Sequence, residues 1–183
     1  VVLVSPARAQ TLSDGLVVHY PYDGDATDVS GTGNNGTLNG DPTFGSGVDG
    51  QAIRLDGNGD YTISGSSSTL QISNTLTVSA WIYPRTGSLT SPETKTVKTI
   101  AVQGDNGDTG NNWQFWIENT KLELNKNNSS FAVKTDLSVH EDTWTHVAVT
   151  FDSGTTKFYI NGTLESEKEL GTSSFDTVTD PIR

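Results

Sequence analysis

The chain has 183 residues, of which 32% are hydrophobic, with 19 glycines and no cysteine. This length fits one domain, at the upper end for an all-β sandwich, and the absence of cysteine excludes a disulfide framework or a thiolate metal site. The formal charge of −11, from 22 acidic and 11 basic residues, repels phosphate backbones and anionic lipids. Nucleic acid and membrane surfaces are therefore not expected partners.

The first ten residues differ in character from the rest. Val1 to Val4 are apolar, and Ala7-Arg8-Ala9 has the small-x-small form of a signal-peptide cleavage site. We expect residues 1–10 to be the remnant of a secretory signal and residues 14–183 to form the domain, which predicts a secreted or cell-surface protein. The alternative is a frayed terminal strand, because four apolar residues fall short of an apolar core of about 7–15.

The first third of the domain combines short strands with turns. Leu16 to Tyr20 is predicted to be a strand, and the Gly-, Asn- and Asp-rich segment 23–36 an ordered loop, because these residue types tolerate positive φ. Residues 51–56 and 61–64 are predicted to pair as a hairpin around Gly57-Asn58-Gly59-Asp60.

The stretch from Leu76 to Pro84 is predicted to be the central strand. Val78, Ala80 and Ile82 alternate with a second set of residues that includes Trp81, which is the period of a strand. Because the second set is bulky too, we expect both faces to be covered. Pro84 cannot donate to a ladder and marks the end of the strand.

The second half of the chain repeats this pattern of strands and turns. The strands expected there are 99–103, 113–118, 121–124, 131–135, 144–152, 157–162 and 163–168. About eleven strands at short spacing, with no helical stretch of useful length, predict an all-β fold. We expect an antiparallel two-sheet β-sandwich of jelly-roll type.

Several short motifs occur in an order typical of one family. They are Tyr22-Asp23-Gly24, Asp28-Val29-Ser30-Gly31, Asn35-Gly36-Thr37, Gly50-Gln51-Ala52, Leu55-Asp56-Gly57, Asp60-Tyr61, Leu76 to Ile82, Trp144 to Asp152, and Phe158-Tyr159-Ile160-Asn161-Gly162. With these motifs the chain resembles the laminin-G-like branch of the concanavalin A-like lectin/glucanase superfamily over roughly residues 14–183.

The resemblance implies a module of a larger chain that tethers an enzyme or adhesin to a polysaccharide. It places Trp81 and Trp144 in framework segments, so we expect both to pack, and His146 to be a packed, hydrogen-bonded residue. Such domains usually continue past a Pro-Ile-Arg-like segment into closing strands, whereas this sequence stops at Pro181-Ile182-Arg183. Either the sequence is a fragment that lacks its closing strands, or its sheets close differently.

The loop 23–36 is the candidate cation site, because Ca²⁺ prefers carboxylate, amide and backbone oxygens from a flexible loop. The candidate ligands are Asp23, Asp25, Asp28, Ser30 and Asn35. The resemblance also implies one structural Ca²⁺ near this part of the fold, held partly by a closing strand that this sequence lacks. The alternative is that these side chains bond their own backbone in Asx turns.

Trp116 is the candidate for ligand recognition. In the strand 113–118 we assign Trp113, Phe115 and Ile117 to the core, which leaves Gln114, Trp116 and Glu118 on the other face. An aromatic ring flanked by hydrogen-bonding groups can stack on a sugar. Asp105 and Asn112 in the neighbouring loops are further candidate contacts. The alternative is that a loop covers Trp116.

An enzyme reading would depend on Glu165, Glu167 and Glu169, which alternate and should share one face. Same-face carboxyls on a strand lie about 6–7 Å apart, near the spacing of a glycosidase pair. The glucanases that the chain resembles carry a different pattern, with aromatic residues between the carboxylates. Charged residues of this kind protect exposed strand edges, which is the reading we favour.

The sequence therefore predicts an extracellular, non-catalytic carbohydrate-binding module, lectin-like and braced by a structural calcium ion. The expected partner is an extracellular glycan, with a cell-surface protein as a further possibility. A structural or adhesive spacer that binds protein is the first alternative. A diverged glycoside hydrolase or polysaccharide lyase is the second.

Overall fold

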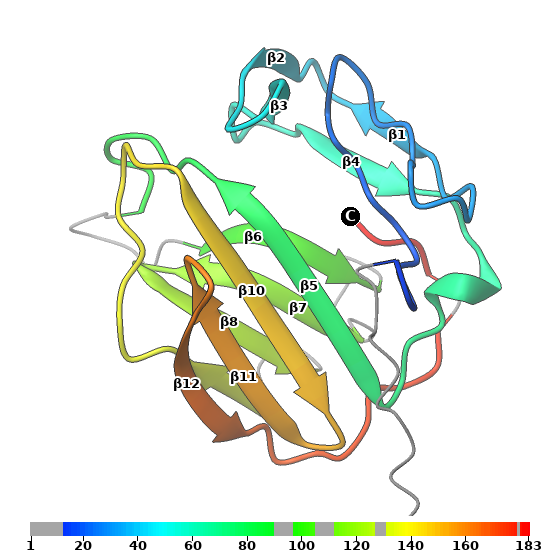
Figure 1. Cartoon of the computed structure of the whole chain (residues 1–183), viewed down its shortest axis with the longest axis vertical. Coiled ribbons are helices and arrows are strands. Elements are labelled where there is room, and N and C mark those ends of the chain that lie inside the picture. Colours follow the sequence, from blue (N-terminus) through cyan, green and yellow to red (C-terminus); the bar gives the residue numbers. More distant parts are fainter. Residues whose placement is uncertain (1–12, 90–96, 105–111, 127–130, 179) are drawn as a thin grey trace, which may run out of the picture.

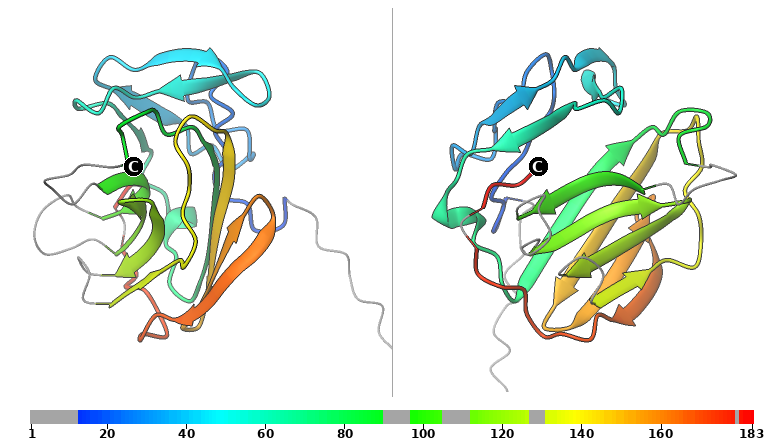
Figure 2. Two further views of the ribbon diagram at one scale, coloured as in Figure 1. Left: turned by 90° about the vertical axis from the view of Figure 1, so that its left-hand side faces the viewer. Right: turned by 180° about the vertical axis from the view of Figure 1, so that it is seen from behind.

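A computed structural model of the chain describes residues 13–89, 97–104, 112–126, 131–178 and 180–183. In these residues it contains twelve strands and one short 3₁₀ helix, Ser68–Leu70. Two four-stranded antiparallel sheets lie face to face, and two small two-stranded sheets lie at one end of them (Figures 1 and 2). This arrangement confirms the predicted antiparallel sandwich. Residues 1–10, the expected signal remnant, lie outside the described residues.

The sheet nearer the viewer in Figure 1 is called here the front sheet. Its strand order is β12-β11-β10-β5. The bounds of these strands are β5 (Thr75–Ile82), β10 (Thr145–Asp152), β11 (Thr155–Ile160) and β12 (Thr163–Glu169). Trp81 of β5 lies directly opposite His146 of β10 in the ladder.

The second large sheet, called the back sheet, has the order β6-β7-β8-β9. Its strands are β6 (Val97–Gln103), β7 (Trp113–Glu118), β8 (Lys121–Lys126) and β9 (Phe131–Lys134). The predicted strand 113–118 is thus confirmed residue for residue.

The hydrophobic core lies between the two large sheets. The largest buried side chains come from facing strands: Trp113 and Phe115 of β7, Phe151 of β10 and Phe158 of β11 are each at most 1% exposed. These side chains face the interior because successive side chains of a strand point to opposite faces of the sheet.

Gln103 is a buried polar residue that joins three segments to the edge of this core. Its Nε2 donates to the carbonyls of Leu70 (2.6 Å) and Asp180 (3.2 Å), and its Oε1 accepts from Trp113 Nε1 (2.9 Å). The side chain is fully buried, so these bonds replace the water that it loses on folding.

The predicted hairpin around Gly57–Asp60 is wrong. Strand β3 (Gln51–Arg54) pairs with β2 (Thr43–Ser46), while β4 (Tyr61–Ser64) pairs with β1 (Gly36–Asn39). The Gly-Asn-Gly-Asp turn therefore leads from one small sheet into the other. Its residues signal a reversal of the chain, but they carry no information on the partner of either strand.

Two further predictions fail. Leu16 to Tyr20 is not a strand; this segment is held by single bonds, such as that from Val29 N to the His19 carbonyl (3.0 Å). The outer face of β5 is not covered either, because Thr77, Ser79 and Trp81 are exposed. β5 is the edge strand of the front sheet and packs on one face only.

The last residues lie between β4 and β6. Arg183 exchanges two backbone hydrogen bonds with Val102 of β6, both 2.8 Å, and the Ile182 carbonyl accepts from Ser64 N of β4 (2.8 Å). Ile182 also packs against the core. These bonds tie the small sheets to the sandwich.

Candidate ligand-binding site

The outer face of the back sheet carries the residues that the sequence singled out. Trp113, Phe115 and Ile117 are buried in the core, so Gln114, Trp116 and Glu118 lie on the outer face, as the alternation predicts. On β8, Asn125 lies opposite Gln114 and Glu123 opposite Trp116.

This outer face is polar but buried. Gln114 is 7% exposed, Glu123 1% and Asn125 0%, and Trp116 is half-buried. A sugar that stacks on a tryptophan needs an open ring face, which this burial does not provide. The burial favours the alternative reading of Trp116 as a packed residue.

A charge cluster lies on the same face. Lys134 Nζ contacts Glu118 Oε1 at 2.6 Å and Glu123 Oε2 at 3.1 Å. Burial alone would lower the pKa of Lys134, but the hydrogen bonds and charges of the two glutamates outweigh it and raise the pKa. The positive charge of Lys134 thus offsets the negative charges of Glu118 and Glu123 on this face.

The two remaining candidate contacts do not extend this face. Asn112 is 1% exposed, and its Nδ2 donates to Gln103 Oε1 (3.2 Å), so it braces the interior. Asp105 lies outside the described residues.

Two of the exposed aromatic side chains, Trp81 and Tyr83, lie instead on the front sheet, at the end where β5 finishes and β10 begins. Trp81 is 52% exposed and meets the His146 ring edge-on, with ring centroids 5.3 Å apart. Tyr83 is 44% exposed and contacts the ring of Trp144 at 5.4 Å. The expected packing role of Trp81 is therefore wrong, whereas Trp144 is half-buried.

The apolar surface continues across the sheet. In the next row of the ladder Ala148 lies opposite Tyr159 of β11, and Tyr159 lies opposite Leu164 of β12. Leu164 is 50% exposed. We call this surface the aromatic patch; its members are Trp81, Tyr83, Trp144, His146, Tyr159 and Leu164.

A polar group lies beside the aromatic patch. Asn161, in the turn between β11 and β12, accepts a bond from His146 N through its Oδ1 (3.0 Å) and donates its backbone N–H to the His146 carbonyl (2.8 Å). Asn161 is exposed. Aromatic ring, imidazole and amide thus lie together on one open face.

Sequence reasoning missed this surface although a signal was present. Trp81 alternates with Val78, Ala80 and Ile82, which pack against the core, so the period of two places Trp81 outside. The bulk of the second set led us to expect a second covered face.

In the predicted cation loop, Asp28 is the centre of a hydrogen-bond network. Its Oδ1 accepts from the backbone of His19 and Ser30, and its Oδ2 from Asn34 N, each at 2.9 Å. The hydroxyls of Ser30 (2.9 Å) and Thr32 (3.0 Å) also donate to Oδ2. Burial alone would raise the pKa of Asp28, but these bonds outweigh it and hold the pKa far below its usual range.

The side-chain oxygens of three other predicted ligands accept backbone N–H groups as well. Asp25 Oδ1 accepts from Thr27 N (2.8 Å), Asp23 Oδ1 from Gln51 N (2.6 Å) and Asn35 Oδ1 from Asp28 N (2.9 Å). In the described part of the chain, Asp23, Asp25 and Asp28 do not come close enough together to share an ion. The carboxylate of Asp28, which already accepts five bonds, has no free lone pair for one. The residues present therefore do not fit the Ca²⁺ site proposed for them, and calcium binding stays a prediction.

Within the described ranges, one group of three carboxylates lies close enough to share an ion, and it is a different one: Asp41, Asp56 and Asp60. Asp60 already accepts from the backbone of Asp41 (2.9 Å) and Asp56 (3.0 Å). These bonds lower the pKa of Asp60. Turn formation between the two small sheets accounts for this cluster.

The three glutamates of β12 do not share a face. A β-bulge opposite Phe158 and Tyr159 displaces Glu165, whose Oε1 accepts from Leu137 N (2.9 Å). Glu167 forms an ion pair with Lys157 (3.3 Å), and Glu169 accepts from the hydroxyl of Thr155 (3.1 Å). The expected alternation is wrong at Glu165, because a bulge adds one residue to the period of two.

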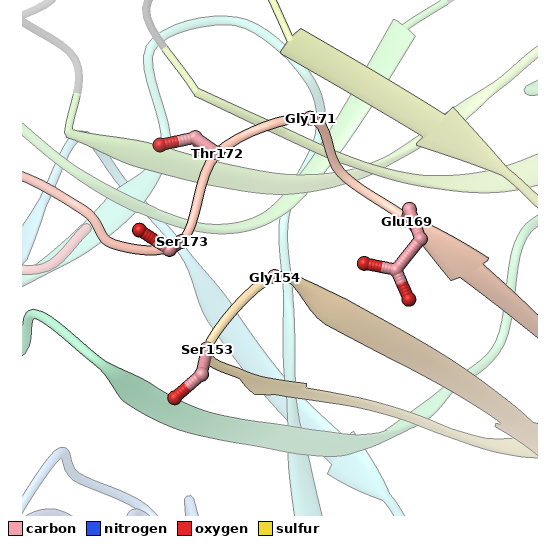
Figure 3. Close-up of a pocket in the computed structure, with 6 residues that line it drawn as sticks. All are labelled: Ser153, Gly154, Glu169, Gly171, Thr172 and Ser173. Atoms are coloured by element: carbon pink, nitrogen blue, oxygen red, sulfur yellow. The ribbon is translucent and has the colours of Figure 1, made fainter.

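A shallow hollow of about 220 Å³ lies at the turn between β10 and β11, at the opposite end of the front sheet from Trp81. Figure 3 shows its lining: Ser153, Gly154, Glu169, Gly171, Thr172 and Ser173. It contains one carboxylate, so it lacks the pair of carboxyls that glycoside hydrolysis uses.

No described helix is long and apolar enough to cross a membrane. Solved structures with the same fold include the binding domain of Paraclostridial Mosquitocidal Protein 1, with 20% identity and a TM-score of 0.76 over 94% of this chain and 44% of that one. The botulinum neurotoxin serotype D ligand binding domain in complex with N-acetylneuraminic acid has 19% identity and a TM-score of 0.65, over 85% and 39%. The chain thus spans less than half the length of either toxin chain.

A third structure matches over most of both chains. It is domain 4 of AbnA, a GH43 extracellular arabinanase from Geobacillus stearothermophilus, in complex with arabinotriose, with 22% identity and a TM-score of 0.60 over 91% of this chain and 90% of that one. No curated protein sequence matches the chain. At these identities the structures show a shared fold. The family profile described as the Concanavalin A-like lectin/glucanases superfamily matches residues 56–183, well over half of the chain, and the chain belongs to that family.

Proposed function

We propose that this protein is a non-catalytic, lectin-like module that binds an extracellular glycan through the aromatic patch of the front sheet. The observation that carries the proposal is the exposure of Trp81, 52% of whose surface faces solvent beside His146 and Asn161. The ring offers an apolar face to the C–H groups of a sugar, and the amide and imidazole offer partners to its hydroxyls.

The proposal moves the sugar site from Trp116 to Trp81. Trp116 is half-buried among Gln114, Glu123 and Asn125, each less than a tenth exposed. Two of the similar solved structures are complexes with a sugar, arabinotriose in one and N-acetylneuraminic acid in the other, which supports carbohydrate as the ligand class. An extracellular location belongs to the same proposal.

Catalysis is not part of the proposal. On the back sheet, Glu118 and Glu123 share an ion pair with Lys134, and on β12 the bulge displaces Glu165 from the alternation with Glu167. A glycosidase needs one protonated and one free carboxyl facing the bond that breaks.

The test compares Trp81→Ala with Tyr61→Ala in binding to a panel of soluble polysaccharides by calorimetry. Tyr61 is a matched control, since it is an aromatic residue of a small sheet and is 39% exposed. Losing a half-exposed indole that a ligand would bury should weaken binding about 10–100-fold, from ~1.5–3 kcal/mol per buried large side chain. Equal binding by the wild type and Trp81→Ala would refute the site.

A second candidate function is a spacer or adhesive module that docks protein on the same surface. Leu164, 50% exposed at the end of the aromatic patch, favours it, because an aliphatic side chain gives little specificity for sugar. Failure of every polysaccharide to bind, with retained self-association or partner binding that Leu164→Ser abolishes, would favour this reading.

A further inference from the structure

We infer that the ligand of the aromatic patch is an uncharged glycan chain of several sugars that lies across the strands of the front sheet. This inference rests on the function proposed above and goes further, because it specifies the charge and the length of the ligand. Two features of the surface carry it: the charges around the aromatic patch and the extent of its apolar rows.

The patch itself carries no acidic, lysine or arginine side chain, and the groups around it are balanced or acidic. Along the same face Lys157 is paired with Glu167 at 3.3 Å. In the described residues next to Tyr83 and Trp144, 84–89 and 139–143, one basic residue, Arg85, occurs with two acidic ones, Glu141 and Asp142. Both acidic side chains bind backbone N–H groups of the loop after Arg85, at 2.6–3.0 Å.

This surrounding charge selects against a polyanion. The molecule has a formal charge of −11, and a polyuronate or a sialylated chain would approach a surface on which the described acidic groups, Glu141, Asp142 and Glu167, outnumber the basic ones, Arg85 and Lys157. Like charges at an interface suppress binding and slow association. A neutral chain meets no such barrier, so the surface is complementary to an uncharged polymer.

The width of the aromatic patch across the front sheet indicates a ligand of several sugars instead of a single sugar. Trp81 lies on β5 and His146 beside it on β10, while Tyr159 lies on β11 and Leu164 on β12. Neighbouring strands are about 4.8 Å apart, so this path crosses three spacings, roughly 14 Å. A surface of this width offers separate contacts to successive sugars.

The experiment is a length series with the intact protein. Neutral arabino-, xylo- and cello-oligosaccharides of one to six sugars are titrated by calorimetry, with polygalacturonate as the charged polymer. The inference predicts that one series binds, that its longest member binds at least ~10-fold tighter than its disaccharide, which corresponds to ~1.4 kcal/mol of added contact, and that polygalacturonate does not bind.

Substitutions at two positions across the aromatic patch distinguish contacts to the first sugars from contacts to the later ones. Tyr159→Ala should weaken binding of the longest oligosaccharide several-fold and leave the disaccharide unchanged, whereas Trp81→Ala should weaken both; Tyr61→Ala is the control. Monosaccharide binding as tight as that of the longest member, or polygalacturonate binding, would overturn the inference and leave the proposed function standing. No binding by any glycan would overturn both.

Discussion

Asp28 gives a direct test of how the N-terminal loop is held. In Asp28→Asn one carboxylate oxygen becomes an NH₂ group that must face hydrogen-bond donors. Its best orientation points toward the hydroxyls of Ser30 and Thr32, which can turn to accept, but it still leaves the backbone N–H of Asn34 without an acceptor. One orphaned buried donor and the loss of charge-assisted bonds together cost about 2–4 kcal/mol.

The assay is thermal and urea unfolding of the variant and the wild type. For a domain of this size the loss corresponds to a fall in Tm of roughly 5–15 °C. Asp25→Asn is the matched control, because Asp25 is exposed and accepts one bond, from Thr27 N, so its change should stay below about 1 kcal/mol.

Two conditions sharpen this test. The deficit of Asp28→Asn should be the same in EDTA and in added Ca²⁺, because the bonds are made by the protein itself. Since the folded pKa of Asp28 is lowered, its stabilisation is complete above the unfolded pKa of about 3.9 and is lost as pH falls below it. A deficit that appears only with Ca²⁺, or no deficit at all, would refute the reasoning.

Two other substitutions test the buried polar groups. Burial and the nearby Tyr22 and Asp28 raise the pKa of Tyr20 to about 12, so the stability that Tyr20 contributes is complete below its unfolded pKa of about 10 and is lost as pH rises toward 12. The stability of Tyr20→Phe should therefore depend less on pH between 10 and 12 than that of the wild type. The same pH dependence in both proteins would contradict this. Gln103→Leu leaves buried partners without a hydrogen bond, among them the indole N–H of Trp113, so the free energy of unfolding measured in urea should fall by about 2–4 kcal/mol. A fall of less than about 1 kcal/mol would mean that the hydrogen bonds of Gln103 do not stabilise the fold.

Much of the sandwich could be predicted from the sequence, because burial on one face of a strand imposes a period of two. The assignment of Trp113, Phe115 and Ile117 to the core follows from that rule and is confirmed. What the rule cannot supply is pairing: residues 51–54 and 61–64 flank a good turn but bond to other strands. Partner choice depends on contacts distant in sequence.

The candidate sites were harder to predict, for three separate reasons. Glu165 departs from its neighbours through a bulge, which no residue at 163–169 signals. Asp28 has the composition of a cation ligand, yet the same oxygens serve backbone turns equally well. The assignment of Trp81 to packing came from the family framework, but the alternation along β5 places Trp81 on the outer face of the front sheet, where it is 52% exposed.

The most direct measurement of the central claim is an NMR titration that follows the indole N–H signals of the four tryptophans as a binding glycan is added. We expect the signal of Trp81 to shift first and to saturate with the calorimetric Kd, the signal of Trp144 to follow, and the signals of Trp113 and Trp116 to stay in place. A shift of Trp116 while Trp81 does not move would contradict the account and return the site to the back sheet.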